Sequence, residues 1–476
     1  MYDSIQHFNE FGVKKIEETI KKFLIESKDI ADLVIGVQNS LFELGRNIIT
    51  EVLEQLDEEL RQSKERKKRW EIVRKDTTSL LTSFGEIRYS RTYFKAKSGG
   101  KRQYLVDSIV GISPHERVSS DVVINAIEEA IDSSYRKAGE VASYVEGISK
   151  QAVMDKVHQI QVQEPELVVK EKREVKTLYI EADEDHVALQ QSNGKDEKGK
   201  YNTAMPKLVY VHEGYDTEKS SMKRKVLKNP RYFGGDMHPE ELWLKVSEYI
   251  DKQYDEKSIE TIYISGDGAS WIRQGCTWIN KSRFVLDNYH LNKYVKAATM
   301  HLSNKEIYQE LRDALEWPDK KELKSVFKKI LSLTESETKR EAVKAARRYI
   351  LNNWDGIEIK AEKGSEIIGC SAEGHVSHVL SDRLSSRPKG WSRLGISQMS
   401  QLLIYKKNGG KIYDLVMAQK RKESKYKQVL EQESYIKTLR QSAGRYYDSW
   451  NCSLPAVAIG QKTGLYKELK SIIGRI

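Results

Sequence analysis

Three acidic residues that lie far apart in the sequence are the best candidates for metal-dependent chemistry. Asp183 lies in the β-prone stretch TLYIEADEDHVALQ, Asp267 follows the β-rich run IYI in SGDG, and Glu373 lies in GCSAEGHVSH. Carboxylate oxygens are preferred ligands of Mg²⁺ and Mn²⁺, and a pair of such ions can activate a nucleophile and stabilise the leaving oxygen of a phosphodiester. If folding gathers the three acids, the sequence predicts a Mg²⁺ or Mn²⁺ site for phosphoryl transfer.

Each acid also has a structural explanation. Period-two alternation along a strand puts Glu181, Asp183 and Asp185 on one face, so Asp183 can be a solvated strand residue, and Asp185 can be the ligand instead. Asp267 in Gly-Asp-Gly suits a turn. Glu373 suits the first turn of a helix, where the helix dipole favours an acid. Taken singly, each acid is better explained by structure, and only their joint order favours chemistry.

Asp287 and His290 form a second candidate pair in the stretch DNYH. They are three residues apart, so a helix beginning there puts them on one face. We expect the pair to contact the region of a scissile phosphate or to support the metal site; a helix cap with a hydrogen-bonded histidine is the structural alternative. Zinc-ligand residue types also occur nearby, but without a paired spacing, so a zinc site is the minority interpretation. These residues are Cys370, His375 and His378.

The elements around the acids follow an α/β order. Strands are expected at 177–190, 207–212, around 232–233, at 259–264 and at 284–286, with a helix at 239–254 and helices after the acid at 267. This order is typical of a ribonuclease-H-like fold rather than a Rossmann fold, and neither a dinucleotide-binding glycine fingerprint nor a P-loop is present. We therefore expect a ribonuclease-H-like α/β catalytic domain at 174–400, with an all-helical insertion at about 292–360.

The flanking regions predict a multi-domain chain. We expect a helical N-terminal region at 1–75, a small β-hairpin unit at 76–118, a helix-turn-helix region at 119–165 and a basic helical C-terminal tail at 401–476. In the third region Gly147 breaks one helix and Ser149 caps the next. A DNA-binding helix-turn-helix directs the start of its second helix at the bases, which predicts DNA contacts from Ser149, Lys150 and Gln151. An ordinary αα-hairpin is the alternative.

Charge favours a polyanionic partner. The 476 residues include 80 Lys and Arg against 70 Asp and Glu, a net charge of +10, and basic proteins bind nucleic acid through phosphate neutralisation and counterion release. Two further basic stretches are expected to contact DNA through Lys223, Arg224 and Lys225, and through Arg387, Lys389 and the interleaved Trp391.

Three cysteines are too few for a disulfide framework, and no apolar run is long enough for a membrane span. The N-terminus shows no pattern of a secretory signal. We therefore expect a cytoplasmic, nucleoid-associated protein without a membrane partner.

Taken together, these motifs resemble the ISLre2 insertion-sequence family, of the UPF0236 type, within the Mutator/IS256-like group of DDE transposases. The stretches that carry the resemblance are LYIEADEDHVALQ, IYISGDGASWI, DNYH and GCSAEGHVSHVLSDRLSSRPKGWSRLG, and it extends to the N-terminal helices, the hairpin SFGEIRYSRTYF and the helix-turn-helix. The resemblance implies that Asp183, Asp267 and Glu373 are the catalytic, metal-holding acids. It implies that Asp287 and His290 are the group's Cys/Asp-x-x-His element. One departure is Glu184, at a position where such sequences usually have glycine.

The resemblance implies a transposase that binds the terminal inverted repeats of its element, cleaves their 3′ ends and joins them to target DNA as a homo-oligomer. The residues alone predict only metal-dependent phosphoryl transfer on nucleic acid. Two alternatives stay open. One is a DNA-binding protein with a degenerate centre, motivated by the sequence Asp183-Glu184-Asp185. The other is a ribonuclease-H-like nuclease that does not join strands.

Overall fold

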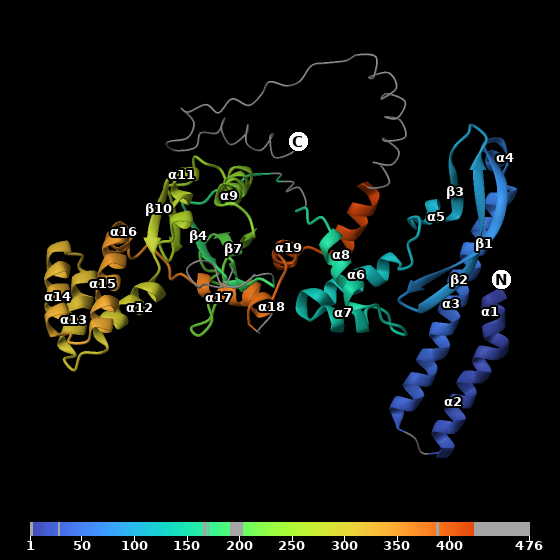
Figure 1. Cartoon of the computed structure of the whole chain (residues 1–476), viewed down its shortest axis with the longest axis horizontal. Coiled ribbons are helices and arrows are strands. Elements are labelled where there is room, and N and C mark those ends of the chain that lie inside the picture. The colour runs from blue at the N-terminus through green and yellow to red at the C-terminus, as the bar shows by residue number, and fades with distance from the viewer. Residues whose placement is uncertain are drawn as a thin grey trace, which may run out of the picture. The chain divides into compact units, whose positions relative to one another are not determined.

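The computed structural model describes residues 3–26, 29–164, 169, 171–190, 203–386 and 390–422 (Figure 1). The chain divides into two compact units, one made of residues 1–161 with 410–444 and the other of residues 162–409 with 445–476. We call their described parts the N-terminal unit and the sheet unit. Both contain helices and strands, so the expected mixed α/β, multi-domain organisation is confirmed. No helix in the described ranges is long and apolar enough to cross a membrane.

The N-terminal unit begins with helices. They are α1 (Asp3–His7), the π-helix η1 (Phe8–Gly12), α2 (Val13–Glu26), α3 (Ile30–Gln62) and α4 (Lys64–Arg69). Asp29 caps α3, since its side chain accepts a hydrogen bond from the Ala31 N–H at 2.8 Å. A strand begins at Trp70, so the expectation that helix extends to residue 75 is wrong. Pairing of residues 70–82 with the strand that follows them decides the conformation of this segment.

A three-stranded antiparallel sheet follows the helices. Its strands are β1 (Trp70–Thr82), β2 (Gly85–Ala96) and β3 (Arg102–Tyr104), and the short helix α5 (Leu105–Val110) comes next. The predicted hairpin around Gly85 is confirmed, because β1 and β2 pair from Trp70↔Ala96 to Thr82↔Gly85. Asp57 joins the sheet to α3, since its carboxylate accepts hydrogen bonds from the backbone N–H and the hydroxyl of Thr92.

Three short helices complete this part of the unit: α6 (Ser120–Asp132), α7 (Tyr135–Val141) and α8 (Lys150–Gln159). α7 and the segment that leads into α8 approach closely at two glycines, which have no side chain. A Cβ on Gly139 would stand 2.2 Å from the Ile148 carbonyl oxygen, and one on Gly147 would stand 2.7 Å from the Gly139 carbonyl oxygen. The connection between α7 and α8 covers residues 142–149, which is longer than the three- or four-residue turn of a DNA-binding helix-turn-helix.

The last described helix of the N-terminal unit, residues 412–422, packs beside α8. The Gln419 side chain accepts a hydrogen bond from the Gln161 N–H and donates one to the Gln159 carbonyl. The predicted helical tail is therefore present as far as residue 422, and residues 423–476 lie outside the described residues.

The sheet unit contains a five-stranded sheet in the order β10-β9-β4-β7-β8. Its strands are β4 (Thr177–Glu184), β7 (Lys207–His212), β8 (Arg231–Gly235), β9 (Thr261–Gly266) and β10 (Ser282–Leu286). β4 is central, pairing in parallel with β9 and antiparallel with β7. β10 continues the parallel side and β8 the antiparallel side. A separate two-stranded ribbon is made by β5 (Val187–Ala188) and β6 (Thr203–Ala204).

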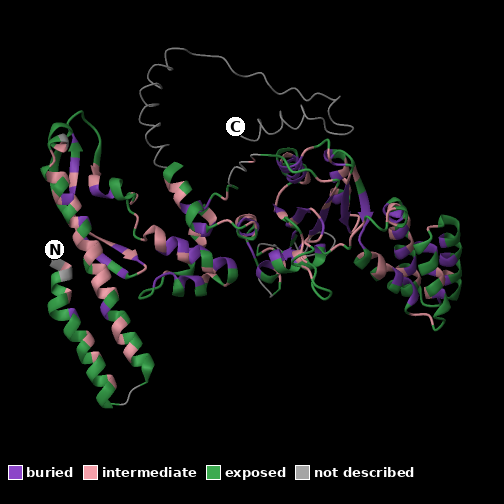
Figure 2. Cartoon of the chain, turned by 180° about the vertical axis from the view of Figure 1, so that it is seen from behind, coloured by how far each residue is buried: buried purple, intermediate pink, exposed green. Residues whose placement is uncertain are grey.

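The two faces of the central strand differ in chemistry. Leu178, Ile180 and Ala182 of β4 are fully buried in an apolar core with α9 (Pro239–Gln253) and the short helices α10 (Ser270–Arg273) and α11 (Gly275–Trp278). Of the alternate residues of β4, Glu181 and Asp183 are also buried but are acidic, whereas Thr177 and Tyr179 are partly exposed. Figure 2 colours the strands of this sheet as largely buried. One sheet face therefore makes the core, and the other is available for polar functional groups.

A helical block separates the sheet from the last acid. It comprises α12 (Asn288–Thr299), α13 (Glu306–Glu316), α14 (Lys320–Leu333), α15 (Glu337–Asn352) and α16 (Trp354–Glu362). These helices bury an apolar stripe that includes Leu311, Leu323 and Phe327. The all-helical insertion predicted from the sequence thus corresponds to observed helices. After the block come α17 (Ala372–Val376), the π-helix η2 (Ser377–Ser381), α18 (Asp382–Leu384) and α19 (Arg393–Lys407).

Candidate functional site

Asp183 and Asp267 lie at the same edge of the sheet. β4 and β9 pair in parallel with Glu181 opposite Ser265. Two residues further along each strand the same register leads to Asp183 and Asp267. Functional groups of open α/β sheets collect at the carboxyl ends of parallel strands. The pairing of β4 with β9 therefore brings together two acids that are 84 positions apart in the chain (267 − 183).

Asp183 experiences the charge of the other two acids. Its side chain is buried, and burial raises the pKa of its carboxyl group to about 7. A hydrogen bond from the Glu184 N–H opposes this rise, the charges of Glu373 and Asp267 add to it, and His290 opposes it. Carboxylates that share a site raise one another's pKa in this way. The fold thus brings Asp267 and Glu373 within electrostatic reach of Asp183, and we call these three residues the acidic site.

The loop that carries Asp267 is held by the helical block. The Asp267 carboxylate accepts a hydrogen bond from the Ala269 N–H at 2.8 Å, and the Tyr349 hydroxyl of α15 donates to the Asp267 carbonyl oxygen. Gly268 has a φ of +89°, and a Cβ there would stand 2.2 Å from Oδ1 of Asn353. Asp267 is therefore a turn residue, as its structural explanation predicted, and its charge also acts on Asp183.

Glu373 is exposed on the first turn of α17, and its helix is tied to the sheet. Two residues before Glu373, Ser371 donates hydrogen bonds to Glu181 of β4 through its N–H and its hydroxyl. Glu181 also accepts from the Tyr210 hydroxyl and pairs with Nε2 of His212 at 3.1 Å. Burial opposes ionisation of Glu181, but the His212, Tyr210 and Ser371 hydrogen bonds prevail and lower its pKa.

Asp287 and His290 make a direct contact. Asp287 caps α12 by accepting the Tyr289 N–H at 3.0 Å, and its other oxygen pairs with Nδ1 of His290 at 3.0 Å. Burial opposes ionisation of Asp287, but the bond to His290 leaves its pKa lowered. The same bond raises the pKa of His290 against the effect of burial, and the charges of Asp183 and Asp267 raise it further. The pair is thus both a helix cap and a neighbour of the acidic site.

The two acids after Asp183 are engaged by other partners. Glu184, the residue at the usual glycine position, accepts a hydrogen bond from the indole N–H of Trp271. Burial raises the pKa of Glu184, and the charge of Asp267 adds to this. Both oxygens of Asp185 accept from the Ser385 hydroxyl at 2.9 Å. The geometry therefore favours Asp183 over Asp185 as the first acid of the cluster.

The donor chemistry of the acidic site fits a hard divalent cation. Asp183, Asp267 and Glu373 offer carboxylate oxygens, the ligand type of Mg²⁺ and Mn²⁺. Within the described ranges, however, no three His, Cys, Asp or Glu side chains stand together as ligands of one ion.

The alternative zinc site is not formed. The ring of His375 stacks on Tyr210 with centroids 4.4 Å apart, and its Nδ1 bonds the Tyr232 hydroxyl at 3.0 Å. His378 pairs with Asp382 instead. The histidines near Cys370 therefore take part in separate contacts.

The residues expected to read DNA in the N-terminal unit are exposed. Ser149 caps α8 by accepting the Ala152 N–H at 3.1 Å, and the Gln151 amide donates to Asp155 at 3.0 Å. Lys150 stands beside them. Two of these three side chains thus already stabilise the helix, and Lys150 has its charge available for a phosphate.

The basic residues Lys223, Arg224 and Lys225 lie on the loop between β7 and β8 and are exposed. A backbone hydrogen bond of 2.7 Å from Ser221 to Arg224 makes the tip of this loop a tight turn. Met222, which the sequence analysis did not single out, occupies that tip with 99% of its surface exposed. The sequence could have indicated this arrangement of an apolar residue beside several cations, because Met222 directly precedes the Lys-Arg-Lys run.

The third basic stretch does not behave as expected at Trp391. Its side chain is 7% exposed, its indole N–H donates to the Leu384 carbonyl at 2.9 Å, and its backbone pairs with Ala188 and Gln190. Burial removes Trp391 from the surface where a DNA contact would form. The other two predicted residues, Arg387 and Lys389, lie outside the described residues.

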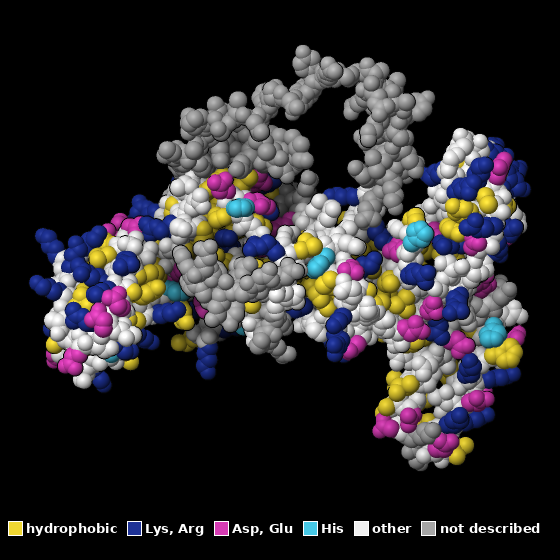
Figure 3. All heavy atoms as spheres, in the orientation of Figure 1, with side chains coloured by type: hydrophobic (Ala, Val, Ile, Leu, Met, Phe, Trp, Pro, Cys, Tyr) yellow, Lys and Arg dark blue, Asp and Glu magenta, His cyan; other side chains and the backbone are white. Residues whose placement is uncertain are grey.

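The helical block adds basic surface that the sequence analysis treated only as an insertion. Lys and Arg side chains gather over this block at the left of Figure 3. On α14 the exposed Lys321, Lys324 and Lys328 form one stripe, opposite the buried apolar stripe of the same helix. Their spacing of three and four residues was the available sequence signal.

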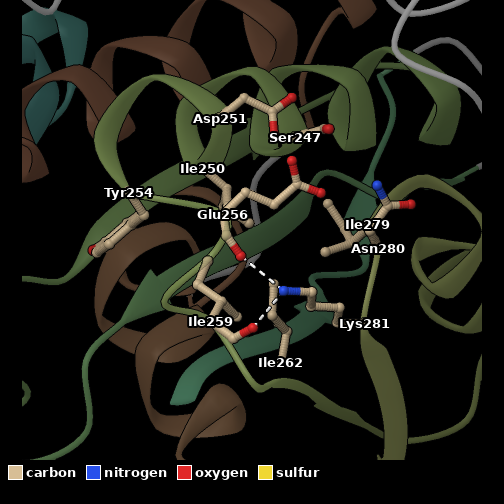
Figure 4. A pocket seen from close by; sticks show the side chains of 10 residues that line it. All are labelled: Ser247, Ile250, Asp251, Tyr254, Glu256, Ile259, Ile262, Ile279, Asn280 and Lys281. Carbon is tan, nitrogen blue, oxygen red and sulfur yellow. Dashed lines mark hydrogen bonds between the residues drawn. The ribbon is translucent and has the colours of Figure 1, made fainter. Parts of the chain in front are cut away.

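Two pockets in the described part of the sheet unit lie outside the acidic site. One is at the amino-terminal end of β9, away from Asp267, where Lys281 donates to the Glu256 and Ile259 carbonyls at 2.7 and 2.6 Å (Figure 4). Lys281 therefore stabilises the loop that precedes β9. The other lies between the end of β10 and the helical block, beside Asp287. It contains Lys360, whose pKa is lowered by burial against the opposing charge of Asp287.

Comparison with known proteins places the chain in a family. The family described as "Uncharacterised protein family (UPF0236)" matches residues 24–422. A UPF0236 protein of Caldanaerobacter subterraneus subsp. tengcongensis is 40% identical over 462 residues, covering 96% of this chain and 95% of the relative. Another protein of that organism, whose name joins eleven numbered designations, is 39% identical over the same length and with the same coverage. A Streptococcus gallolyticus protein named "UPF0236 protein in vanSb 3'region" is 26% identical over 409 residues, covering 82% of this chain and 86% of the relative. The UPF0236 part of the resemblance drawn from the sequence is thus confirmed. The chain therefore belongs to the uncharacterised protein family UPF0236.

Proposed function

We propose that this chain is a DNA transposase of the ISLre2 type, within the Mutator/IS256-like group, that uses Asp183, Asp267 and Glu373 as a DDE triad. The observation that carries the proposal is the electrostatic cluster of these acids. Burial and the charges of Glu373 and Asp267 raise the pKa of Asp183 to about 7, although the three residues come from distant parts of the sequence. Perturbed carboxyl groups of this kind are enriched at functional sites.

The topology of the sheet unit supports a ribonuclease-H-like catalytic domain. If its five strands are numbered by their order in the chain, their spatial order is 5-4-1-2-3, with antiparallel pairing on the 1-2-3 side and parallel pairing on the 1-4-5 side. The sequence predicted this strand and helix order, with the first acid on the first strand and the second just after the fourth. The helical block then stands between Asp287 and Glu373.

In the proposed mechanism Asp183, Asp267 and Glu373 would hold Mg²⁺ or Mn²⁺. The bound ions would supply an activated nucleophilic oxygen and charge stabilisation for the leaving 3′-oxygen. Asp183 must lose its proton to act as a ligand, so its raised pKa makes the site sensitive to pH near neutrality. His290 is held by Asp287, and its raised pKa extends the range in which a positive charge can face a phosphate.

Exposed cations support a DNA partner. Lys150 in the N-terminal unit, the basic loop after β7 and the lysine stripe of α14 offer phosphate contacts. The name of one relative joins eleven numbered designations. A shared name of that kind is what several copies of one gene would produce, and repeated copies in a genome are typical of insertion sequences.

A second candidate is a DNA-binding protein whose centre is degenerate. It is favoured by Glu184 at the usual glycine position and by the separation of the three carboxylates in the described structure. A third, a nuclease that does not join strands, shares the acidic site with the first. These candidates differ in their products, so product analysis separates them.

The test is Mg²⁺-dependent nicking and joining of DNA that carries the terminal repeats of the element. Asp267→Asn is expected to abolish nicking and to leave DNA binding intact. Asp255→Asn is a matched control, because Asp255 is also a half-buried turn acid, at the other end of β9, where it accepts the Lys257 N–H at 3.3 Å. Binding without nicking by the unaltered protein would favour the degenerate candidate, nicking without joined products would favour the nuclease, and nicking by Asp267→Asn would refute the assigned centre.

A further inference from the structure

Glu181 connects the two segments that carry the first and the last acid. It lies two residues before Asp183 on β4, and it accepts hydrogen bonds from Ser371, which lies two residues before Glu373. The proposed chemistry gives Glu181 no role. Its side chain is only 2% exposed, so it is a buried carboxylate and not a solvated neighbour of the acidic site.

The hydrogen bonds of Glu181 leave neither oxygen without a donor. Oε2 accepts from the Ser371 N–H, from the Ser371 hydroxyl at 3.1 Å and from the Tyr210 hydroxyl. Oε1 pairs with Nε2 of His212 at 3.1 Å, and His212 is fully buried. A buried carboxylate is tolerated only when it is bonded in this way, and removing it would leave the buried Tyr210 hydroxyl and His212 ring without this acceptor.

The helix that carries Glu373 depends on such contacts. α17 continues directly into η2 and α18 as one helical segment, residues 372–384, and a helical segment of that length is only marginally stable by itself. Its start is held by the Ser371 bonds to Glu181. Its last turn is held by His375, which stacks on Tyr210 and bonds the hydroxyl of Tyr232. Tyr210 contacts both Glu181 and His375, so one set of sheet side chains holds α17 at both ends.

We propose that Glu181 is a positioning residue, which holds Ser371 against β4 and thereby fixes Glu373 relative to Asp183. His212 and Tyr210 hold the Glu181 carboxylate in turn. The consequence for metal binding rests on the proposed function, whereas the anchoring of α17 does not. Residues that orient metal ligands commonly change metal affinity by roughly 10–100-fold when they are replaced.

The first experiment measures amide hydrogen exchange of residues 371–376 in the full chain. Glu181→Leu removes the acceptors and is expected to raise exchange in this segment at least tenfold. Glu213→Leu is the matched control. The Glu213 side chain is 5% exposed and bonds Arg173 at 2.9 Å and Tyr254 at 3.2 Å, without a contact to α17 among the described residues. Unchanged exchange in Glu181→Leu, or an equal rise in both variants, would overturn the proposal.

Milder variants keep the test decisive if Glu181→Leu does not fold. Ser371→Ala removes one of the two hydrogen bonds that Ser371 donates to Glu181, and it is expected to raise exchange less than Glu181→Leu does. Ser371→Thr retains a hydroxyl and should therefore keep the protection of the unaltered chain. Glu181→Gln keeps an oxygen that can accept from Ser371 and should behave nearly as the unaltered chain does. A wild-type exchange pattern in Ser371→Ala would also overturn the proposal.

The second experiment measures Mn²⁺ binding to the full chain by electron paramagnetic resonance. Glu181→Leu, or Ser371→Ala in its place, is expected to weaken binding by roughly tenfold or more, and Glu213→Leu is not. Increased exchange together with wild-type Mn²⁺ affinity would mean that Glu181 anchors α17 without positioning a ligand, which overturns the proposal. If the unaltered chain binds no Mn²⁺, the proposed metal site fails, and the exchange experiment still decides whether Glu181 anchors α17.

Discussion

Replacing Asp183 with asparagine is expected to stabilise the metal-free protein, and to do so more strongly as the pH rises. The pKa of Asp183 rises on folding from an ordinary value of 3.8 to about 7, because the side chain is buried beside Glu373 and Asp267. Between these two values the folded state binds more protons than the unfolded state does. The free energy of unfolding therefore falls as the pH rises through this interval.

The size of the effect follows from the two pKa values. Each pKa unit corresponds to about 1.4 kcal/mol, so the raised pKa of Asp183 lowers the free energy of unfolding by roughly 4 kcal/mol at pH 8 and by about 1 kcal/mol at pH 4.5, where the folded state keeps the proton. Asparagine has nearly the same shape, carries no charge and keeps an oxygen that can accept the Glu184 N–H. The gain of Asp183→Asn over the unaltered chain should thus grow by about 3 kcal/mol between these pH values.

Urea denaturation in the presence of EDTA, followed by tryptophan fluorescence, provides the measurement. Six of the eight tryptophans lie in the described part of residues 162–409, so the signal reports mainly on the sheet unit. Added Mn²⁺ should stabilise the unaltered chain, by about 2.7 kcal/mol at a hundred times the Kd, and should not stabilise the variant.

Asp185→Asn is the control for Asp183→Asn. It changes another buried acid of the same region, but it weakens hydrogen bonds to Ser385, so it should destabilise the protein at both pH values. The reasoning is refuted if Asp183→Asn gains no stability at pH 8, or if its gain is equal at the two pH values.

Three other changes test the supporting structure. Gly268→Ala should lower the free energy of unfolding by about 2–4 kcal/mol, because φ is +89° there and the new Cβ would meet Asn353. Denaturation at pH 7 measures this change, and a loss below about 1 kcal/mol would count against the close approach. Ser149→Ala should cost about 1 kcal/mol through loss of the α8 cap, measured by thermal unfolding, and an unchanged midpoint would contradict a capping role. Simultaneous replacement by alanine in the loop after β7 should reduce the slope of log affinity against log salt for DNA binding by up to about 2.7, and an unchanged slope would remove this loop from the interface. The residues replaced are Lys223, Arg224 and Lys225.

Local patterns in the sequence were sufficient to predict much of the fold. The run Lys207–His212 was predicted as a strand and is β7, because it is short and rich in β-prone residues; the helix expected at 239–254 is α9, because its apolar residues have helical spacing. Trp70–Thr77 shows where local reasoning fails. This segment follows a basic helix and was assigned to it although Trp70, Ile72 and Val73 favour a strand, and it becomes part of β1 because β2 pairs with it along its length.

The candidate functional residues show the same difference between what local sequence predicts and what tertiary contacts decide. The residue types and order of Asp183, Asp267 and Glu373 in the sequence pointed to a cluster of acids, whereas Trp391 looked like an exposed aromatic among cations. Only tertiary contacts show that Trp391 is buried against Leu384. A pattern of residue types specifies what a side chain can do, and burial by distant segments decides whether it is free to do it.

The sequence by itself determined the inventory of this protein: which acids, histidines and cations it has, which segments are helix or strand, and which family it resembles. Tertiary structure alone decided that β4 and β9 pair so as to put Asp183 beside Asp267, and that Glu181 becomes a buried anchor for Ser371 rather than a solvated strand acid. The physical reason is that electrostatic coupling and desolvation depend on distances between groups that are remote along the chain, and local sequence does not encode these distances.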